Sequence, residues 1–448
     1  MKKSRMGSNP LDMQNPIPAT SSLEWIQDSR SDDAPAASDT TERSQERLKI
    51  DETPVPVQSM QAVVLSGGGA TGAFEVGVLK ALVKGMSPAT DRQPFSFDVI
   101  TGTSVGAFNA TCMVLHDDPE AALDQLEDFW LNRISSHKGR TGNGIFRFRP
   151  PAQSLFSPEA LMKNPTEILS RLGADSIFLT RDWLQRGLGF FQSSEPIEHR
   201  ALEMMNLSSY VSIEPLQELL EDAVPLDIVR RARPALKVVT TNWETGEAVV
   251  FDKEQLTDDI GHKAIMASTA LPGFFPPVDI NGHLYCDGVV VMNTPTLPAI
   301  RAGADVLHMI YMDPDVKEIP LAKFRNTLDT FDRMLSIQFA ININKDIEQA
   351  ERINRGLVAM ERAQGDESEA GQETQDFVKT ASQIQKRLAT SRAPHKKLCI
   401  HRYHPRGDLS GILSMLNFKR ENIEAYIERG IKEAVEHDCE ASGCVLPE

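Results

Sequence analysis

Residues 61–74 read QAVVLSGGGATGAF, and residues 97–106 read FDVITGTSVG; these two stretches decide the fold. Each begins with a short apolar run, typical of a buried strand, and continues into a glycine-rich turn. Apolar side chains then recur at helical spacing from Ala73 to Lys84, and a second helix is predicted from the other turn to about Leu115. A strand, turn and helix that occur twice predict an α/β fold with a parallel sheet.

Further elements are predicted along the rest of the chain from apolar periodicity and turn residues. An Asn-Gly pair predicts a hairpin at 279–283, and a Glu-Thr-Gly-Glu turn joins two earlier strands. The predicted strands are Leu236–Thr241, Ala248–Phe251, Ala304–Met312 and Leu398–Tyr403, and the predicted helical stretches are Lys323–Arg392 and Arg420–His437.

Composition divides the chain into three parts. Residues 1–56 are rich in Ser, Asp, Pro, Thr and Gln without apolar periodicity, which predicts a disordered N-terminal tail. Residues 57–315 form the predicted α/β domain, in which the irregular stretch 140–210 is a candidate cap or membrane-contact insertion. Residues 316–448 are predicted to be mainly helical, with one late strand that packs on the α/β domain.

Charge and targeting signals limit the partners of the protein. The chain of 448 residues carries a formal net charge of −16, which argues against nucleic acid as a partner and requires any membrane contact to be local. No apolar region follows Met1-Lys2-Lys3, and no apolar run reaches the roughly 18 residues of a membrane span. We expect a cytoplasmic protein with peripheral membrane contact, and export by a non-Sec route would leave the same pattern. The sequence does not predict a protein partner or an oligomeric state.

The cysteines show no framework spacing and are odd in number, which indicates free thiols in a reducing compartment. They are Cys112, Cys286, Cys399, Cys439 and Cys444. Cys439 and Cys444 could pair or bind a metal, but we interpret them as two surface thiols in a C-terminal tail and expect no metal site.

The strongest local motif is Gly102-x-Ser104-x-Gly106 between a strand and a helix. The turn is too sharp for bulky neighbours, and it lifts the serine hydroxyl out of the sheet. The N-terminus of the following helix would favour a developing anion. The motif therefore indicates a nucleophile, while the alternative is a tight strand-to-helix turn without chemistry.

A second motif is the turn Gly67-Gly68-Gly69. Adjacent glycine N–H groups can converge on the oxyanion of an acyl transfer. The turn also fits a dinucleotide fingerprint, but that site requires an acidic residue at the end of the second strand, where this chain has Gly102-Thr103-Ser104. A phosphate-binding loop would require Gly-Lys-Ser/Thr, which is missing. A plain glycine turn is the remaining alternative.

The third motif, Asp287-Gly288, follows a predicted strand. A carboxylate at one strand end can reach the cleft that holds a serine at another strand end. Asp-Gly is also a common turn pair, so this motif alone indicates little.

Taken together and in this order, the three motifs resemble the patatin-like phospholipases, which are related to the cytosolic phospholipase A fold. Three further stretches strengthen the resemblance: 240–242 with its Thr-Gly hairpin, 267–277 (ASTALPGFFPP), and 303–305. The chain departs from the family pattern at Thr71, where a basic residue is common, and at Val289, where Gly or Ala is common. Neither departure removes a group that the chemistry needs.

The resemblance implies a three-layer α/β/α fold with a mainly parallel central sheet and a lipid acyl hydrolase that needs no cofactor or metal. Phospholipids or lysophospholipids are the implied substrates. Ser104 would be the nucleophile, and Asp287 would be the general base in a Ser-Asp dyad. The implied oxyanion hole is Gly67, Gly68 and Gly69, and the remaining motif glycines are Gly72, Gly102, Gly106 and Gly288. Apolar neighbours of Asp287, namely Val289, Val290 and Val291, would raise its pKa.

Two alternatives to the dyad enzyme are a Ser-His-Asp carboxylesterase and an inactive lipid-binding scaffold. The first would use His308, His401 or His404 as its base.

Candidate membrane patches combine aromatic rings with positive charge. They are Phe146-Arg147-Phe148-Arg149, and Trp183 with Arg186, Phe190 and Phe191. The alternative is a cap packed on the core.

Overall fold

The computed structural model describes residues 59–136, 143–149, 165–192, 207–312, 327–365, 397–406 and 414–446. The chain divides into two compact units, Met1–Val57 and Gln58–Glu448, and every described residue lies in the second. The tail predicted at 1–56 therefore lies outside the described residues, as do 366–392 of the charged helical stretch.

An eight-stranded sheet forms the centre of the second unit, in the order β10-β9-β1-β2-β5-β8-β7 with β6 paired to β5. Five strands run parallel, and the β5–β6, β5–β8 and β7–β8 pairs are antiparallel. The strands are β1 (Gln61–Leu65), β2 (Val99–Thr103), β5 (Ala235–Asn242), β6 (Ala248–Asp252), β7 (Val278–Ile280), β8 (His283–Asp287), β9 (Val306–Ile310) and β10 (Cys399–Tyr403). The predicted strands and hairpins are confirmed, although β2 runs on to Thr103 and so reaches Ser104 directly.

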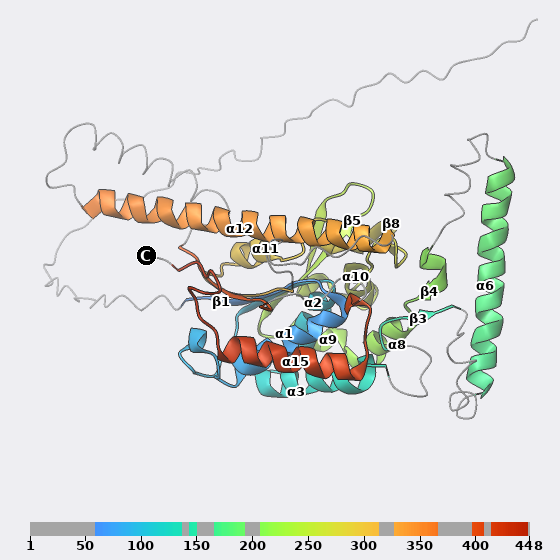
Figure 1. The fold of residues 1–448 in the computed structure, drawn as a ribbon, viewed down its shortest axis with the longest axis horizontal. Helices are drawn as coiled ribbons and strands as arrows, with labels where there is room; N and C mark the ends of the chain where they lie inside the picture. The colour runs from blue at the N-terminus through green and yellow to red at the C-terminus, as the bar shows by residue number, and fades with distance from the viewer. Residues whose placement is uncertain are drawn as a thin grey trace, which may run out of the picture. The chain divides into compact units, whose positions relative to one another are not determined.

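Helices cover both faces of this sheet (Figure 1). Their bounds are α1 (Ala73–Val83), α2 (Val105–Cys112), α3 (Pro119–Asp128), α6 (Pro165–Gln192), α8 (Glu214–Ala223), α9 (Leu226–Arg231), α10 (Gly261–Ser268), α11 (Thr296–Arg301), α12 (Thr327–Gly365) and α15 (Arg420–Val435). In Figure 1, α1, α3 and α15 lie below the strands, whereas α11 and α12 lie above them. The three-layer α/β/α architecture is confirmed.

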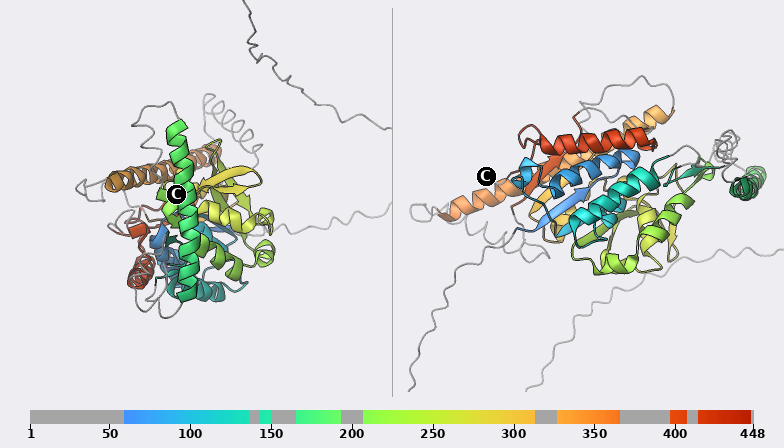
Figure 2. Two further views of the ribbon diagram at one scale, coloured as in Figure 1. Left: turned by 90° about the vertical axis from the view of Figure 1, so that its right-hand side faces the viewer. Right: turned by 90° about the horizontal axis from the view of Figure 1, so that it is seen from below.

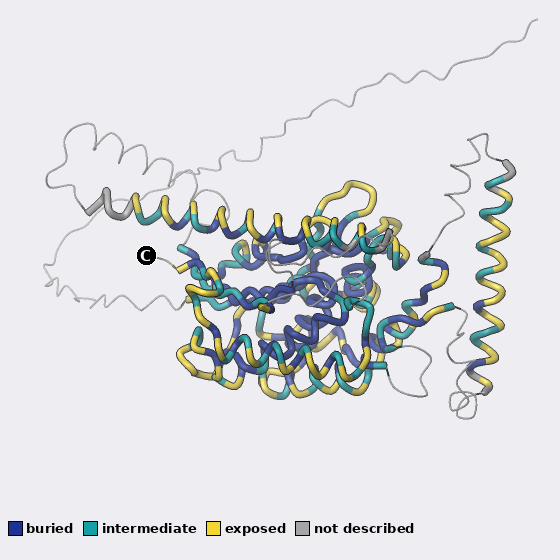
Figure 3. Tube along the Cα trace, viewed as in Figure 1, coloured by how far each residue is buried: buried dark blue, intermediate teal, exposed yellow. Residues whose placement is uncertain are grey.

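Strand β1 shows how the sequence builds two cores. Val63 and Leu65 belong to the core under α1 and α15, while the alternating Ala62 and Val64 belong to the core under α12. Both sets are fully buried, which explains why this strand reads as a continuous apolar run rather than an alternating one. Figure 3 shows the buried strands at the centre and exposed residues on the outer helix faces.

Helices α1 and α15 approach each other closely because each has a glycine at the contact. A Cβ added at Gly77 would lie 2.0 Å from the carbonyl oxygen of Ile427, and one added at Gly430 would lie 2.1 Å from that of Phe74. The C-terminal helix is therefore packed directly on the helix that follows the glycine loop, as the end-on view in Figure 2 also shows.

The C-terminal region also joins the sheet itself. Strand β10 pairs with β9, and the side chain of Asn354 on α12 bonds both the N–H and the carbonyl of Leu398, at 2.8 and 2.6 Å. Strand β10 is thus an edge strand of the central sheet.

The stretch 140–210 holds the long helix α6 and the strand β3 (Arg147–Phe148), which pairs with β4 (Val211–Ser212) just after the stretch to form a small second sheet. Arg147 is buried, and its guanidinium bonds Asp175 of α6 and Glu214 of α8, each at 2.7 Å. The candidate patch 146–149 is therefore not a membrane surface at Arg147, because that charge is neutralised inside the protein. None of the helices in the described part of the chain combines the length and hydropathy of a membrane span.

Candidate active site

Ser104 is the single residue between the end of β2 and the start of α2. Its backbone angles, φ 56° and ψ −128°, are rarely adopted by residues other than glycine. The flanking glycines are required by space. A Cβ at Gly102 would lie 2.2 Å from the carbonyl oxygen of Gly106, and a Cβ at Gly106 would lie 2.6 Å from that of Leu65. The predicted sharp turn is present, and such strain at a nucleophile is typical of functional turns.

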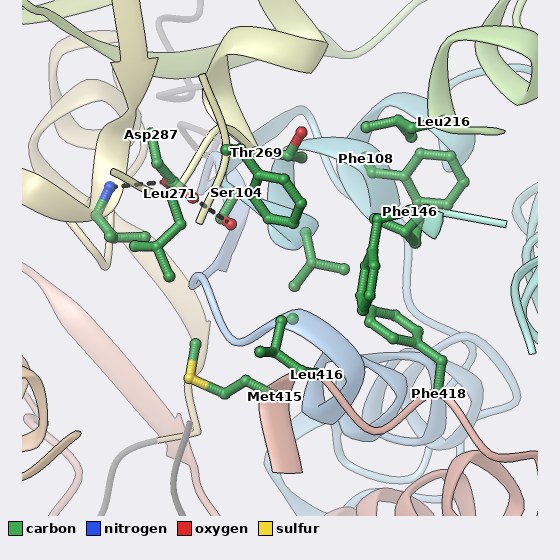
Figure 4. A pocket seen from close by; sticks show the side chains of 15 residues that line it. Ser104, Phe108, Phe146, Leu216, Thr269, Leu271, Asp287, Met415, Leu416 and Phe418 are labelled. Carbon is green, nitrogen blue, oxygen red and sulfur yellow. Dashed lines mark hydrogen bonds between the residues drawn. The ribbon is translucent and has the colours of Figure 1, made fainter. Parts of the chain in front are cut away.

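Asp287 ends strand β8 and faces this serine. The Ser104 hydroxyl donates to Asp287 Oδ2 at 2.7 Å, and the other carboxylate oxygen accepts from the N–H of Val289 at 3.0 Å (Figure 4). The hydroxyl of Thr241, on β5, donates to the carbonyl of Asp287 at 2.9 Å and fixes the strand end. The structure thus brings together the two residues that the sequence motifs singled out 183 positions apart.

Burial determines the charge of this carboxyl group. Asp287 is 1% exposed, and burial raises its pKa to about 7, although the bonds from Val289 and Ser104 act in the opposite direction. Of the three valines expected around it, Val289 is buried, whereas Val290 and Val291 are largely exposed. The reason is that residues 288–290 form a 3₁₀ turn that directs the following side chains outward.

The glycine loop has fewer N–H groups free to bind an oxyanion than its sequence predicted. Gly67 donates its N–H to Asn293 Oδ1 at 2.9 Å, so this group is already engaged. Within the described part of the chain, the N–H groups of Gly68 and Gly69 have no acceptor. Gly69 has a φ of +59°, and a Cβ there would lie 2.3 Å from the carbonyl oxygen of Met415.

Two residues that sequence reasoning did not single out hold the site in place. Asn293 fixes Gly67, and Ser268 accepts the backbone N–H of Ser104 at 2.9 Å while donating to the carbonyl of Val239 at 2.6 Å. Ser268 lies in the 267–277 stretch that resembles the family, so that resemblance was the feature of the sequence that could have pointed to it. The sequence contained no indication of a role for Asn293, because a lone asparagine near a turn is common.

The other motif glycines, Gly72 and Gly288, also lie where a side chain would clash. A Cβ at Gly72 would lie 2.5 Å from the side chain of Val105, and one at Gly288 would lie 2.6 Å from the carbonyl of Val239. These glycines let the loop and the strand end pack closely against the segments around the serine turn.

An apolar pocket opens beside Ser104 and Asp287 (Figure 4). The ring of Phe146 lies 5.9 Å from those of Phe275 and Phe418, measured between centroids. The lining comes from segments that are far apart in the chain: Gly69, Ser104, Val105, Phe108, Ile145, Phe146, Leu216, Thr269, Leu271, Phe275, Asp287, Val289, Met415, Leu416 and Phe418. Such a pocket suits a hydrocarbon chain rather than a nucleotide.

The histidines considered as alternative bases lie away from the serine. His308, on β9, is buried with its Nδ1 3.2 Å from the Tyr403 hydroxyl, and its ring stacks on that of His401. His404 stacks on Tyr311. In the regions that the structure describes, no hydrogen bond joins any of the three to Ser104 or Asp287.

Comparison with known proteins agrees with this geometry. The family model described as patatin-like phospholipase matches residues 63–300, which include the serine turn, the glycine loop and Asp287. Among solved structures, VipD from Legionella pneumophila aligns with 84% of this chain and 67% of its own, at 14% sequence identity and a TM-score of 0.32. Because the family model covers more than half of the 448 residues, the chain belongs to the patatin-like phospholipase family.

Proposed function

We propose that the protein hydrolyses carboxylic esters of phospholipids or lysophospholipids through a Ser104–Asp287 dyad. The observation that carries this proposal is the 2.7 Å hydrogen bond between the serine hydroxyl and a buried carboxylate at the mouth of an apolar pocket. The family supports lipid acyl hydrolysis in general, whereas the residue roles and the substrate class are our proposal.

The first step is attack of Ser104 Oγ on the ester carbonyl. As the bond forms, the hydroxyl proton passes to Asp287 Oδ2, which already accepts its hydrogen bond. A carboxyl group with a pKa of about 7 holds a proton far better at neutral pH than one at the ordinary value near 4. Asp287 can then return the proton to the departing alcohol, which leaves an acyl-enzyme.

Attack by the serine places a negative charge on the carbonyl oxygen of the substrate, and this charge requires hydrogen-bond donors. Gly68 and Gly69 offer the two uncommitted N–H groups of the loop, and the N-terminus of α2 begins at Val105, next to the serine. Gly67 serves the site indirectly, because its bond to Asn293 fixes the loop. Water then attacks the acyl-enzyme with Asp287 as the base, and the serine is restored.

The acyl chain of the lipid would occupy the pocket lined by Phe108, Phe146, Phe275, Met415 and Phe418. These side chains offer no charge to a substrate, so selection there acts on hydrocarbon. The polar headgroup would remain at the pocket mouth.

Transient membrane contact is part of this proposal, and helix α6 is the surface we assign to it. Ile177, Leu184 and Leu188 are 71, 61 and 53% exposed and follow one another at helical spacing on one face. Trp183, which belongs to the second candidate patch, is also 53% exposed. An amphipathic helix with such a face binds at a lipid–water boundary.

The decisive experiment replaces Ser104 by Ala and measures fatty-acid release from phospholipid and lysophospholipid vesicles. We expect loss of release and loss of labelling by a fluorophosphonate probe, while Ser96→Ala, at an exposed serine, keeps both. Folded His308→Gln and His404→Gln variants should retain most of the activity. If either were as inactive as Ser104→Ala, a histidine-dependent triad would replace the dyad, and undiminished release by Ser104→Ala would end the proposal.

A further inference from the structure

The C-terminal end of the chain gathers two histidines and two cysteines around one point, far from the serine. His401 lies on β10, His437 follows α15, and Cys439 and Cys444 lie in the segment after it. One ligand atom from each of the four side chains lies within 4.8 Å of all the others. His437 is buried, and the other three are half-buried. The two cysteines are therefore not the isolated surface thiols that their sequence suggested.

The distances within this cluster match those around a tetrahedral zinc ion. Bonds of about 2.3 Å to sulfur and about 2.0 Å to nitrogen, at tetrahedral angles, place a sulfur and a nitrogen about 3.5 Å apart. The observed separations are 3.5 Å from Cys439 Sγ to His401 Nδ1, 3.5 Å from Cys439 Sγ to His437 Nε2, and 3.4 Å from Cys444 Sγ to His437 Nε2.

We propose that His401, His437, Cys439 and Cys444 bind one Zn²⁺ ion in a Cys₂His₂ site. Mixed thiolate and imidazole ligands in tetrahedral order favour zinc over magnesium or calcium, which prefer oxygen. All four positions are filled by the protein, so the site is structural and has no open position for a substrate or a reactive water. The proposal does not depend on the ester hydrolysis described above.

Neighbouring groups support the ligands in the way that metal sites require. When His401 binds through Nδ1, its Nε2 is directed to Cys399 Sγ, 3.4 Å away, which fixes the ring. The backbone N–H of Arg402 donates to Cys444 Sγ at 3.3 Å, a contact that stabilises a thiolate. The ring of Tyr403 packs on His437 with centroids 4.5 Å apart.

The position of the site indicates its role. Strand β10 is an edge strand, and its outer side pairs with the C-terminal segment through two bonds between Ile400 and Val445, of 2.7 and 3.0 Å. Zinc would fasten this segment and the end of α15 to the edge, which would otherwise expose unpaired backbone groups. A metal that links residues 401 and 444 closes a long loop and restricts the unfolded chain.

The test measures the metal content of the full-length protein, purified without chelator. We expect about one zinc per chain, and a metal-stripped sample should take up Co²⁺ with the thiolate charge-transfer and d–d bands of a tetrahedral site. Cys439→Ser and Cys444→Ser should each reduce the bound zinc at least about 10-fold. The control is His283→Gln, which removes an exposed histidine on β8 that is not a ligand and should keep the full zinc content.

Three results would overturn the proposal. One is protein that contains no zinc and gives no tetrahedral cobalt spectrum on titration, a measurement that does not depend on any variant. Another is a Cys439–Cys444 disulfide found by mass spectrometry in freshly purified protein. The third is equal zinc loss in His283→Gln and Cys439→Ser, which would show that the ligand set is wrong.

Discussion

Replacing Asp287 by Asn should stabilise the protein while it abolishes turnover. The amide has nearly the same shape and can still accept from the N–H of Val289 and donate to Ser104, so both hydrogen bonds of the carboxylate have counterparts. It cannot take a proton from the serine, and loss of a general base lowers the rate by roughly 100-fold or more. The gain in stability arises because a buried, ionised carboxylate is no longer present.

The size of that gain follows from the pKa. Raising a carboxyl pKa from about 4 in the unfolded chain to about 7 in the native state costs about 4 kcal/mol once the group is ionised. Because the native pKa is the higher one, the wild type is most favoured below about pH 4 and loses this free energy as the pH rises towards 7. The variant has no such dependence, so its advantage should grow by about 2–3 kcal/mol between pH 5 and pH 8.

Thermal unfolding of both proteins at pH 5 and pH 8 measures this growth directly. At about 2 °C per kcal/mol for a unit of this size, the gap in Tm should widen by about 5 °C. Asp117→Asn, at an exposed carboxylate, serves as the control and should show no widening. A gap that is the same at both pH values would refute the raised pKa, and with it the argument that Asp287 is tuned to hold a proton.

Three further predictions concern the loop, the helix contact and the membrane surface. Gly69→Ala should lower kcat/KM about 100-fold, because the added methyl meets a carbonyl and displaces the loop, whereas Gly246→Ala, with the same kind of backbone but open space, should not. Gly430→Ala should reduce the free energy of unfolding by about 2 kcal/mol through its clash with the facing helix, and Gly356→Ala on α12 should not destabilise; equal urea midpoints would contradict this. Leu184→Glu should weaken binding to lipid vesicles about 10-fold and leave hydrolysis of a soluble short-chain ester intact; equal loss on both would indicate a packing role for α6.

The local signals in the sequence predicted the fold class, and they singled out Ser104, Asp287 and the glycines that the structure brings together. Gly102 could be recognised because the sharp turn leaves no room for a side chain, and its clash with the carbonyl of Gly106 acts within five positions. The contact from Asn293 to Gly67 spans 226 positions and has no local pattern, so the engaged N–H could not be foreseen.

The same limit applied to charged residues and to the proposed zinc ligands. Arg147 beside two aromatic rings has the composition of a membrane patch, and only the fold reveals Asp175 and Glu214 around it. His401 and Cys444 lie on a strand and in a tail that the sequence describes separately. Their proximity depends on β10 pairing with the C-terminal segment at the sheet edge.

The backbone carbonyl of Met415 lies against Gly69, so the chain beyond residue 400 contacts the glycine loop directly. Together with Leu416 and Phe418, Met415 forms one wall of the pocket, although it lies more than 300 positions from Ser104 and outside the matched segment 63–300. Under the proposed function, substitutions in this wall would alter which acyl chains fit without touching Ser104, Asp287 or the glycine turn. The proposed substrate range can therefore change through this C-terminal segment while the proposed dyad stays the same.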